Sequence, residues 1–292
     1  MDTFKGVIAA TITPFTPDGR FNEMVFESVM RSNIQSGVDG FWISGGTGES
    51  VLLSEQEVIR TAEISAELCR NKVKTIVHIG ALTTLSAVNK AKGAAKAGVD
   101  AIACVPPFFY HPTDQTIIDH YKAVVDAAGL PLFVYNQPRY TGVEFTPHMM
   151  EKITQNVPGI IGIKHSAADL NNIYHFRNMG LQVFTGHGSL FLSALTAGAV
   201  GVVDGPLTVA PEIWVRIYRD YCNGNLSNAQ KAQDQATSLV HLMLEFGFYA
   251  ACKVLTGVRL GIDCGNPRLP IPSLSPDERD KLLQDASKLG II

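Results

Sequence analysis

Short apolar segments rich in β-branched residues alternate along this chain with longer segments of helical periodicity. The apolar segments show no strict alternation of apolar and polar positions, which is typical of strands covered on both faces in a parallel sheet. The longer segments, including 55–69, 86–97 and 115–128, are long enough for helical crossovers between parallel strands. Eight strands are predicted, at residues 6–12, 40–44, 75–79, 101–105, 132–135, 160–164, 183–185 and 201–203.

A weak internal repeat marks the places where a helix ends and a strand begins. The repeat reads SGVDG at 36–40, AGVDA at 97–101 and AGAVG at 197–201, and glycine is the residue expected just after a helix C-terminus. Eight βα units within about 200 residues favour a (β/α)8 barrel. An open, doubly wound sheet remains an alternative on the pattern alone.

The pattern changes after Pro211, where only helices are predicted. These helices cover residues 213–222, 227–246, 250–257 and 276–288, and a proline-rich stretch at 267–276 interrupts them. We therefore predict an α/β protein: a (β/α)8 TIM barrel in residues 1–223 and a C-terminal helical extension in residues 224–292. No segment is rich enough in Gly, Ser or Pro to indicate a linker to a second independent domain.

Composition narrows the possible partners and surroundings of the protein. The chain has 46% hydrophobic and 17% charged residues, so it is not disordered, and its net charge of −3 comes without the basic cluster that nucleic acid binding requires. No apolar stretch approaches the length of about 18 residues that spans a membrane. Five cysteines without any C-x-x-C spacing favour a reducing, cytoplasmic location.

Lys164 is the first candidate for chemistry, because it ends the predicted apolar strand 160–164. A buried lysine carries a large desolvation cost, so it is paired, reaches solvent, or reacts as an amine. In a barrel the active site forms at the C-terminal ends of the strands. Taken alone, Lys164 fits a snorkelling or ion-paired residue better than a catalytic one.

Other strand ends supply groups that change this balance. The loop 44–50, SGGTGES, has three glycines whose backbone N–H groups could converge on an anion, although a simple tight turn is an alternative. Tyr135 ends the fifth strand, Ser166 follows Lys164, and the segment TGHGS at 185–189 forms a second open loop. A lysine, a tyrosine and an anion-binding loop together suit Schiff-base chemistry on a 2-oxo acid.

The eight histidines lack the spacing of metal ligands, so no metal and no cofactor are expected. His78 and His241 are interpreted as structural histidines. His165 and His187 lie at strand ends and are candidates for substrate contact. No serine lies in a G-x-S-x-G motif, which disfavours a hydrolase.

The chain resembles the dihydrodipicolinate synthase and N-acetylneuraminate lyase group of class I pyruvate aldolases over nearly its whole length. The similar segments are GVIAATITPF at 6–15, the loop 45–50, Y-N-x-P at 135–138 with T-G at 141–142, and G-I-K-x-S-x-x-D at 162–169. The resemblance implies a TIM barrel with a C-terminal helical extension, usually a homotetramer.

The resemblance also implies residue roles. Lys164 would form an imine with pyruvate or a pyruvate-derived substrate, and Tyr135 would move protons. Thr47 and the backbone of Gly46 would hold the pyruvate carboxylate, and the carbonyl of Val203 would line the same pocket. Further candidate substrate contacts are Ser166, Gly186 and Ser189. The expected partners are pyruvate or another 2-oxo acid and an aldehyde, with no nucleic acid and no membrane.

The sequence departs from both well-known branches of this group. Gly46 replaces a threonine or serine, Phe109 replaces a tyrosine that a neighbouring subunit supplies in synthases, and Tyr140 stands where synthases have an arginine. Gly188 and Ser189 replace the acidic pair that binds sugar hydroxyls in sialic acid lyases.

The segments FF at 108–109 and PRLP at 267–270 are similar to the lyases, and the glycine and serine substitutions leave room for a hydroxylated substrate. We therefore predict a Schiff-base aldolase or lyase for a 2-keto-3-deoxy sugar acid, in the manner of N-acetylneuraminate lyase. The alternatives are a dihydrodipicolinate synthase, a 2-keto-3-deoxy acid dehydratase, or a barrel that binds a keto acid without turnover.

Overall fold

Eight parallel strands close into a barrel in the computed structural model, which describes residues 4–110 and 112–292. Each strand pairs with the next, and β1 pairs with β8 to close the ring. The predicted barrel is confirmed, and every predicted strand ends within two residues of the observed one. The strands are β1 (Gly6–Ala10), β2 (Gly40–Ile43), β3 (Lys74–His78), β4 (Ala101–Cys104), β5 (Leu132–Asn136), β6 (Ile160–His165), β7 (Gln182–Thr185) and β8 (Gly201–Asp204).

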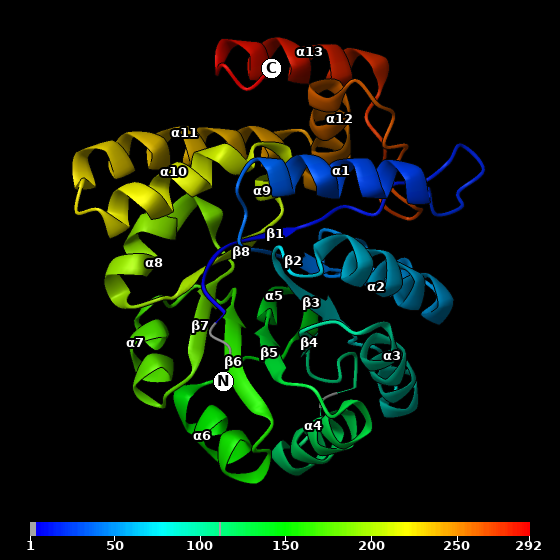
Figure 1. Ribbon diagram of the computed structural model, residues 1–292, viewed down its shortest axis with the longest axis vertical. Helices are drawn as coiled ribbons and strands as arrows, with labels where there is room; N and C mark the ends of the chain where they lie inside the picture. The colour runs from blue at the N-terminus through cyan, green and yellow to red at the C-terminus, as the bar shows by residue number, and fades with distance from the viewer. Residues whose placement is uncertain (1–3, 111) are drawn as a thin grey trace.

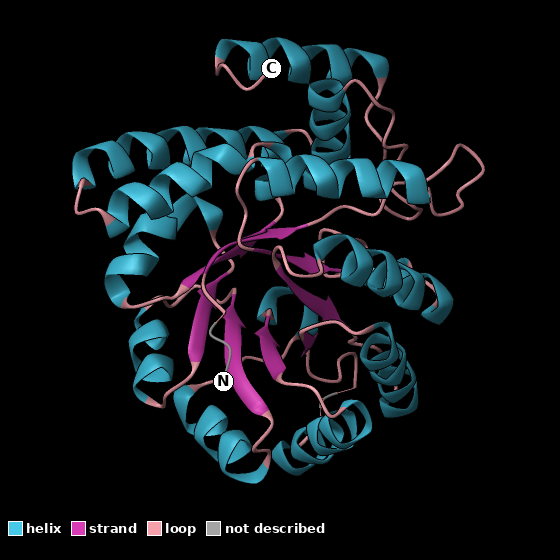
Figure 2. Cartoon of the chain, in the orientation of Figure 1, coloured by secondary structure: helices cyan, strands magenta, loops and turns pink. Residues whose placement is uncertain are grey.

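Helices surround the barrel in the order of the strands that they follow (Figure 1; Figure 2). The main ring contains α1 (Glu23–Gln35), α2 (Glu55–Cys69), α3 (Thr84–Ala97), α4 (Asp114–Ala128), α6 (Pro147–Asn156), α7 (Asn171–Asn178), α8 (Phe191–Ala197) and α10 (Pro211–Cys222). Short helical turns lie in the loops between the strands and this ring: η1 (Ser50–Leu52), α5 (Pro138–Thr141), η2 (Gly188–Leu190) and α9 (Pro206–Val209).

The repeated glycine motif works as predicted at the helix-to-strand junctions. Gly37, Gly98 and Gly198 have positive φ angles of 87°, 84° and 104°, a conformation that side chains with a Cβ rarely adopt. These glycines follow α1, α3 and α8. Each therefore lets the chain leave its helix and turn directly into the next strand.

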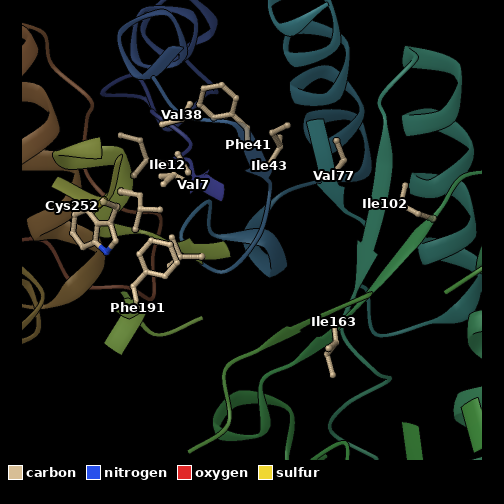
Figure 3. Close-up of a cluster of buried hydrophobic side chains, with 14 of the residues drawn as sticks. Val7, Ile12, Val38, Phe41, Ile43, Val77, Ile102, Ile163, Phe191 and Cys252 are labelled. Carbon is tan, nitrogen blue, oxygen red and sulfur yellow. The ribbon is translucent and has the colours of Figure 1, made fainter. Parts of the chain in front are cut away.

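Apolar side chains form two concentric cores. The outer core lies between the strands and the helices, and Figure 3 shows part of it, including Val7, Phe41 and Ile163. The inner core fills the barrel with residues such as Ile8, Trp42 and Phe184. Because side chains alternate along a strand, neighbours on one strand belong to different cores. The inward-facing set therefore decides which residues reach the mouth of the barrel.

Three helices extend the chain beyond the barrel: α11 (Leu226–Glu245), α12 (Phe248–Leu260) and α13 (Pro276–Lys288). Figure 1 shows them gathered on the side of the barrel that carries α1 and α10, with α13 outermost. Among the described residues no single helix is long and apolar enough to span a bilayer. Only α11 and α12 taken together satisfy both the length and the apolar composition, and the pair is bent by 119°.

A buried ion pair joins this extension to the glycine-rich loop after β2. Lys253 Nζ on α12 lies 2.7 Å from Glu49 Oε1, and both side chains are almost completely buried. The other Glu49 oxygen accepts a hydrogen bond of 2.7 Å from the backbone N–H of Arg268. Arg268 in turn forms a two-pronged ion pair with Glu57 on α2. The C-terminal segment thus fixes the loop that precedes η1.

Replacing Lys253 with methionine should lower the free energy of unfolding by about 3–5 kcal/mol, because Glu49 would remain as a buried charge without its partner. Urea denaturation measures this loss. Lys281→Met is the control, since its ion pair with Glu245 is more than half exposed and contributes about 1 kcal/mol or less. Equal losses in the two variants would contradict the structural role of the buried pair.

Candidate active site

Lys164 lies on β6 with its side chain inside the mouth of the barrel. It is only 4% exposed. Its Nζ lies 4.3 Å from the ring centroid of Tyr135 and 5.0 Å from that of Trp42. Within the described part of the chain no carboxylate forms an ion pair with this amine. Lys164 therefore neither reaches solvent nor forms an ion pair. Of the three possibilities for a buried lysine, only a reactive amine remains.

Tyr135 is brought to Lys164 by the pairing of adjacent strands, since the two residues are register partners in β5 and β6. The Tyr135 ring makes edge-to-face contacts with Trp42, at 5.5 Å between centroids, and with His78, at 5.7 Å. Such contacts fix the ring orientation and stabilise it beyond simple burial. The hydroxyl of Tyr135 is consequently held at one position near the lysine.

His78 is a neutral histidine with both ring nitrogens engaged. Its Nδ1 lies 3.2 Å from the carbonyl oxygen of Ser44, and its Nε2 is 3.4 Å from the backbone N–H of Val105. Val105 donates to Nε2, so Nδ1 carries the proton and donates to Ser44. Burial lowers the pKa of His78 from its usual 6.5 to about 3, and the charge of Lys90 adds to this effect. The structural role predicted for His78 agrees with these bonds, although its contact with Tyr135 was not foreseen.

The loop after β2 is held in a shape that leaves backbone donors free. The hydroxyl of Thr13 donates to the carbonyl of Gly48 over 2.8 Å, and the N–H of Glu49 donates to the carbonyl of Gly46 over 2.9 Å. Across residues 4–110 and 112–292, neither Gly46 nor Thr47 donates its own backbone N–H to another residue. Adjacent free N–H groups of this kind form an anion-binding concavity.

Glycines in this loop have different reasons to be glycines. A Cβ on Gly45 would lie 2.5 Å from the Trp42 indole, so no side chain fits there. A Cβ on Gly46 would lie 3.6 Å from the Tyr135 hydroxyl, which is ordinary contact. Gly45 is thus required by packing, whereas Gly46 leaves open space beside the tyrosine that a side chain could occupy.

The side chain of Thr47, in the loop after β2, lies at the mouth of the barrel close to Gly205, which follows β8. Its side chain is 8% exposed, and a Cβ on Gly205 would lie 2.6 Å from its hydroxyl oxygen. Val203, two residues before Gly205, belongs to the inner core together with Tyr135. The structure therefore brings the predicted residues of β2, β5, β6 and β8 to one place.

Ser166 and Gly186 meet beside Lys164. A Cβ on Gly186 would lie 1.8 Å from Ser166 Oγ and 3.3 Å from Lys164 Cε, so only glycine fits at this position. The buried hydroxyl of Ser166 has no hydrogen-bond partner among the described residues. An unpartnered hydroxyl is costly when buried, so it is available for a ligand.

Three other candidate contacts, His165, Ser189 and His187, form hydrogen bonds within the protein. His165 is on the outer side of the barrel, where its Nε2 bonds to the carbonyl of Asp169 and its ring packs against Phe176. Its contact with substrate stays a prediction, which this outward placement disfavours. Ser189 lies on η2, and its carbonyl accepts a hydrogen bond from Thr237. The Nε2 of His187 bonds to a backbone carbonyl, that of Ala167, at 3.0 Å.

Asp204, at the end of β8, was missed by the sequence analysis. Its two carboxylate oxygens accept hydrogen bonds of 2.8 Å from the backbone N–H groups of Gly188 and Gly205. Burial raises its pKa, while these bonds and the charge of Lys164 oppose the rise. The signal was present, since Asp204 directly follows the predicted strand 201–203. Through its bond to Gly188, Asp204 fixes the loop that follows β7.

Comparison with known families agrees with this arrangement. The model of the dihydrodipicolinate synthetase family matches residues 3–289. The chain belongs to the dihydrodipicolinate synthetase family. Its members are Schiff-base pyruvate aldolases and related carbon–carbon lyases, and this chain is a carbon–carbon lyase, as predicted.

Relatives from both branches of the family are similar to this chain. N-acetylneuraminate lyases of Escherichia fergusonii and Escherichia coli O1:K1 are 31% identical over 254 residues, which is 86% of this chain and 85% of theirs. The structure of CdNal from Clostridium difficile in complex with mannosamine is 27% identical, with a TM-score of 0.94 over 99% of this chain and all of that one. Dihydrodipicolinate synthase from Aquifex aeolicus is 25% identical, with a TM-score of 0.92 over 99% of each chain.

The neutral state of His78 gives a prediction for stability. Between pH 6.5 and 3 the unfolded chain binds a proton at His78 that the folded chain does not. The free energy of unfolding should therefore decrease as the pH is lowered through this range. One such group contributes a slope of up to about 1.4 kcal/mol per pH unit. Urea unfolding of wild type and His78→Gln at several pH values tests this, and the variant should have the smaller slope.

His120, whose pKa burial lowers to about 4, contributes in the same direction in both proteins and provides the common background. Identical slopes for wild type and His78→Gln would show that His78 takes up its proton in the folded state.

Proposed function

We propose that this protein cleaves or forms a carbon–carbon bond between pyruvate and an aldehyde through an imine on Lys164. The observation that carries the proposal is the buried Lys164 amine, which lies against Tyr135 and has no carboxylate partner among the residues that the structure describes. The free N–H groups of Gly46 and Thr47 support it, because a 2-oxo acid needs an anion site beside the imine carbon. Ser166 adds an unpartnered hydroxyl at the same point.

The proposed cleavage begins with a 4-hydroxy-2-oxo acid whose carboxylate occupies the Gly46–Thr47 site. The Lys164 amine attacks C2, and loss of water gives a protonated imine. Tyr135 has given its hydroxyl proton to the water lost in imine formation, and as a phenolate it takes the proton of the C4 hydroxyl. The C3–C4 bond then breaks, and its electron pair moves into the imine as an enamine. An aldehyde leaves. Protonation of C3 and hydrolysis of the imine then release pyruvate and the free lysine.

The relatives support a 2-keto-3-deoxy sugar acid as the substrate class, because the similar lyases act on N-acetylneuraminate by name. A dihydrodipicolinate synthase is less well supported, since Tyr140 stands at the arginine position and is 61% exposed. Dehydration through the same imine differs only in its product: a dehydrated oxo acid in place of pyruvate and an aldehyde. A binding protein without turnover would retain the Lys164 imine and lack both products.

The homotetramer and the cytoplasmic location stay predictions. Large apolar side chains that are more than half exposed lie around one cleft, including Val51, Leu82 and Phe109. Exposed apolar groups gathered in this way are typical of a surface that another subunit covers. Four of the five cysteines are buried as free thiols, which suits a reducing compartment.

Borohydride trapping tests the imine directly. Incubation with pyruvate and sodium borohydride should add one reduced pyruvate unit to Lys164, located by mass spectrometry of the peptides. Lys164→Met should carry no such unit. Lys92→Met, which changes a lysine on α3 outside the site, is the matched control and should be labelled like the wild type. A wild-type protein without adduct at Lys164 would end the imine mechanism.

The role of Tyr135 has its own test. Tyr135→Phe removes the hydroxyl but retains the ring that packs against Trp42 and His78, so folding should be preserved. Turnover should fall by roughly 10²-fold or more, the usual contribution of a positioned proton donor and acceptor. Pyruvate trapping on Lys164 should still be detected. An unchanged kcat would remove Tyr135 from the proton transfer.

A further inference from the structure

A cavity of about 320 Å³ opens beside the hydroxyl-bearing side of Tyr135. It reaches from Tyr135 and Gly46 outward to the C-terminal segment of the chain. Its walls are mainly apolar or aromatic and come from four separate segments: Val51, Val105, Phe108, Tyr249, Pro270 and Ile271. Ligand sites in proteins commonly combine such walls with a small number of polar groups.

The position of this cavity relative to the chemistry suits the aldehyde. In the proposed reaction the aldehyde oxygen exchanges a proton with Tyr135, so the aldehyde carbon lies next to that hydroxyl. Gly46 carries no side chain, and a Cβ there would already contact the Tyr135 hydroxyl at 3.6 Å. The missing side chain therefore leaves a path from the reacting carbon into the cavity.

Most polar groups in the lining are already satisfied by the protein. The two oxygens of Glu49 are bound by Lys253 and by the backbone N–H of Arg268. Both nitrogens of His78 are engaged. The hydroxyl of Thr141 donates to backbone carbonyls and accepts from the N–H of Val143. These groups have little capacity left for the hydroxyls of a ligand.

The remaining polar groups are few and lie around the tyrosines. Burial raises the pKa of Tyr249, as does its hydrogen bond with Tyr140, so the Tyr249 hydroxyl keeps its proton at ordinary pH. The side chains of Ser50 and Gln137 and the hydroxyl of Tyr135 complete the set. A polyhydroxylated sugar chain would bury several hydroxyls here without partners, at a cost of about 1–3 kcal/mol for each.

We propose that the cavity is the aldehyde subsite and that it selects an aldehyde with an aromatic or branched apolar substituent over a polyhydroxylated one. The size agrees, because a cavity of about 150 Å³ already accommodates benzene. This inference rests on the proposed aldolase function and departs from the sugar acid that the lyase relatives favour. Gly46 is the specificity-determining position, since it connects the cavity to Tyr135.

The test compares two aldehydes in aldol addition to pyruvate: benzaldehyde and glyceraldehyde. The wild type should show a kcat/KM about tenfold or more higher for benzaldehyde, the range that apolar pocket contacts provide. Equal values, or a preference for glyceraldehyde, would overturn the inference about the subsite. Pyruvate trapping on Lys164 is measured in parallel, and its failure would instead contradict the aldolase function.

Two variants test whether the preference for benzaldehyde arises in the cavity. Ile271→Asn places a polar group in the cavity wall and should lower kcat/KM for benzaldehyde about tenfold. It should leave pyruvate trapping unchanged, since neither Lys164 nor Thr47 lines this cavity. Leu269→Asn makes the same kind of change two residues away on a side chain that is 84% exposed, and it should leave both measurements unchanged. Equal losses in the two variants, or none in Ile271→Asn, would count against the cavity.

Discussion

The contact of the Lys164 amine with the faces of Tyr135 and Trp42 is the constraint on which the rest of this site depends. A buried amine without a carboxylate partner is costly, and strongly perturbed groups of this kind cluster at sites of chemistry. Here two aromatic rings take the place of a counter-ion at 4.3 and 5.0 Å. An ion-paired lysine would have to break its pair before attacking a carbonyl, and Lys164 does not.

Distant parts of the chain maintain that arrangement. Pairing of β5 with β6 sets Tyr135 against Lys164, and the Trp42 indole excludes any side chain from Gly45. The free N–H groups of the next two residues depend on a loop that the C-terminal extension fixes through the Glu49–Lys253 pair. The helical extension is therefore part of the active-site support, because it anchors the carboxylate loop from outside the barrel.

The sequence predicted the strands and the reactive strand ends well, because buried parallel strands and the residues that follow them have clear local signals. Lys164 and Tyr135 were singled out in this way, whereas the role of Thr47 came from the family resemblance, and all three roles stay predictions. Trp42 and Asp204 were missed, since facing inward or bonding to a neighbouring loop is a property of strand register and barrel closure. The cavity beside Tyr135 could not be predicted for the same reason. Its walls combine loops near residues 50 and 105 with residue 271, which meet only in the folded chain.

In the proposed mechanism Lys164 binds C2 of a 2-oxo acid while the backbone N–H groups of Gly46 and Thr47 bind the carboxylate of the same molecule. A crystal structure of the protein soaked in pyruvate tests it most directly. We predict continuous density from Lys164 Nζ to C2 of pyruvate, with the carboxylate at hydrogen-bond distance from the N–H groups of Gly46 and Thr47. Pyruvate bound without a covalent link to Lys164, or with its carboxylate directed away from that loop, would contradict the account.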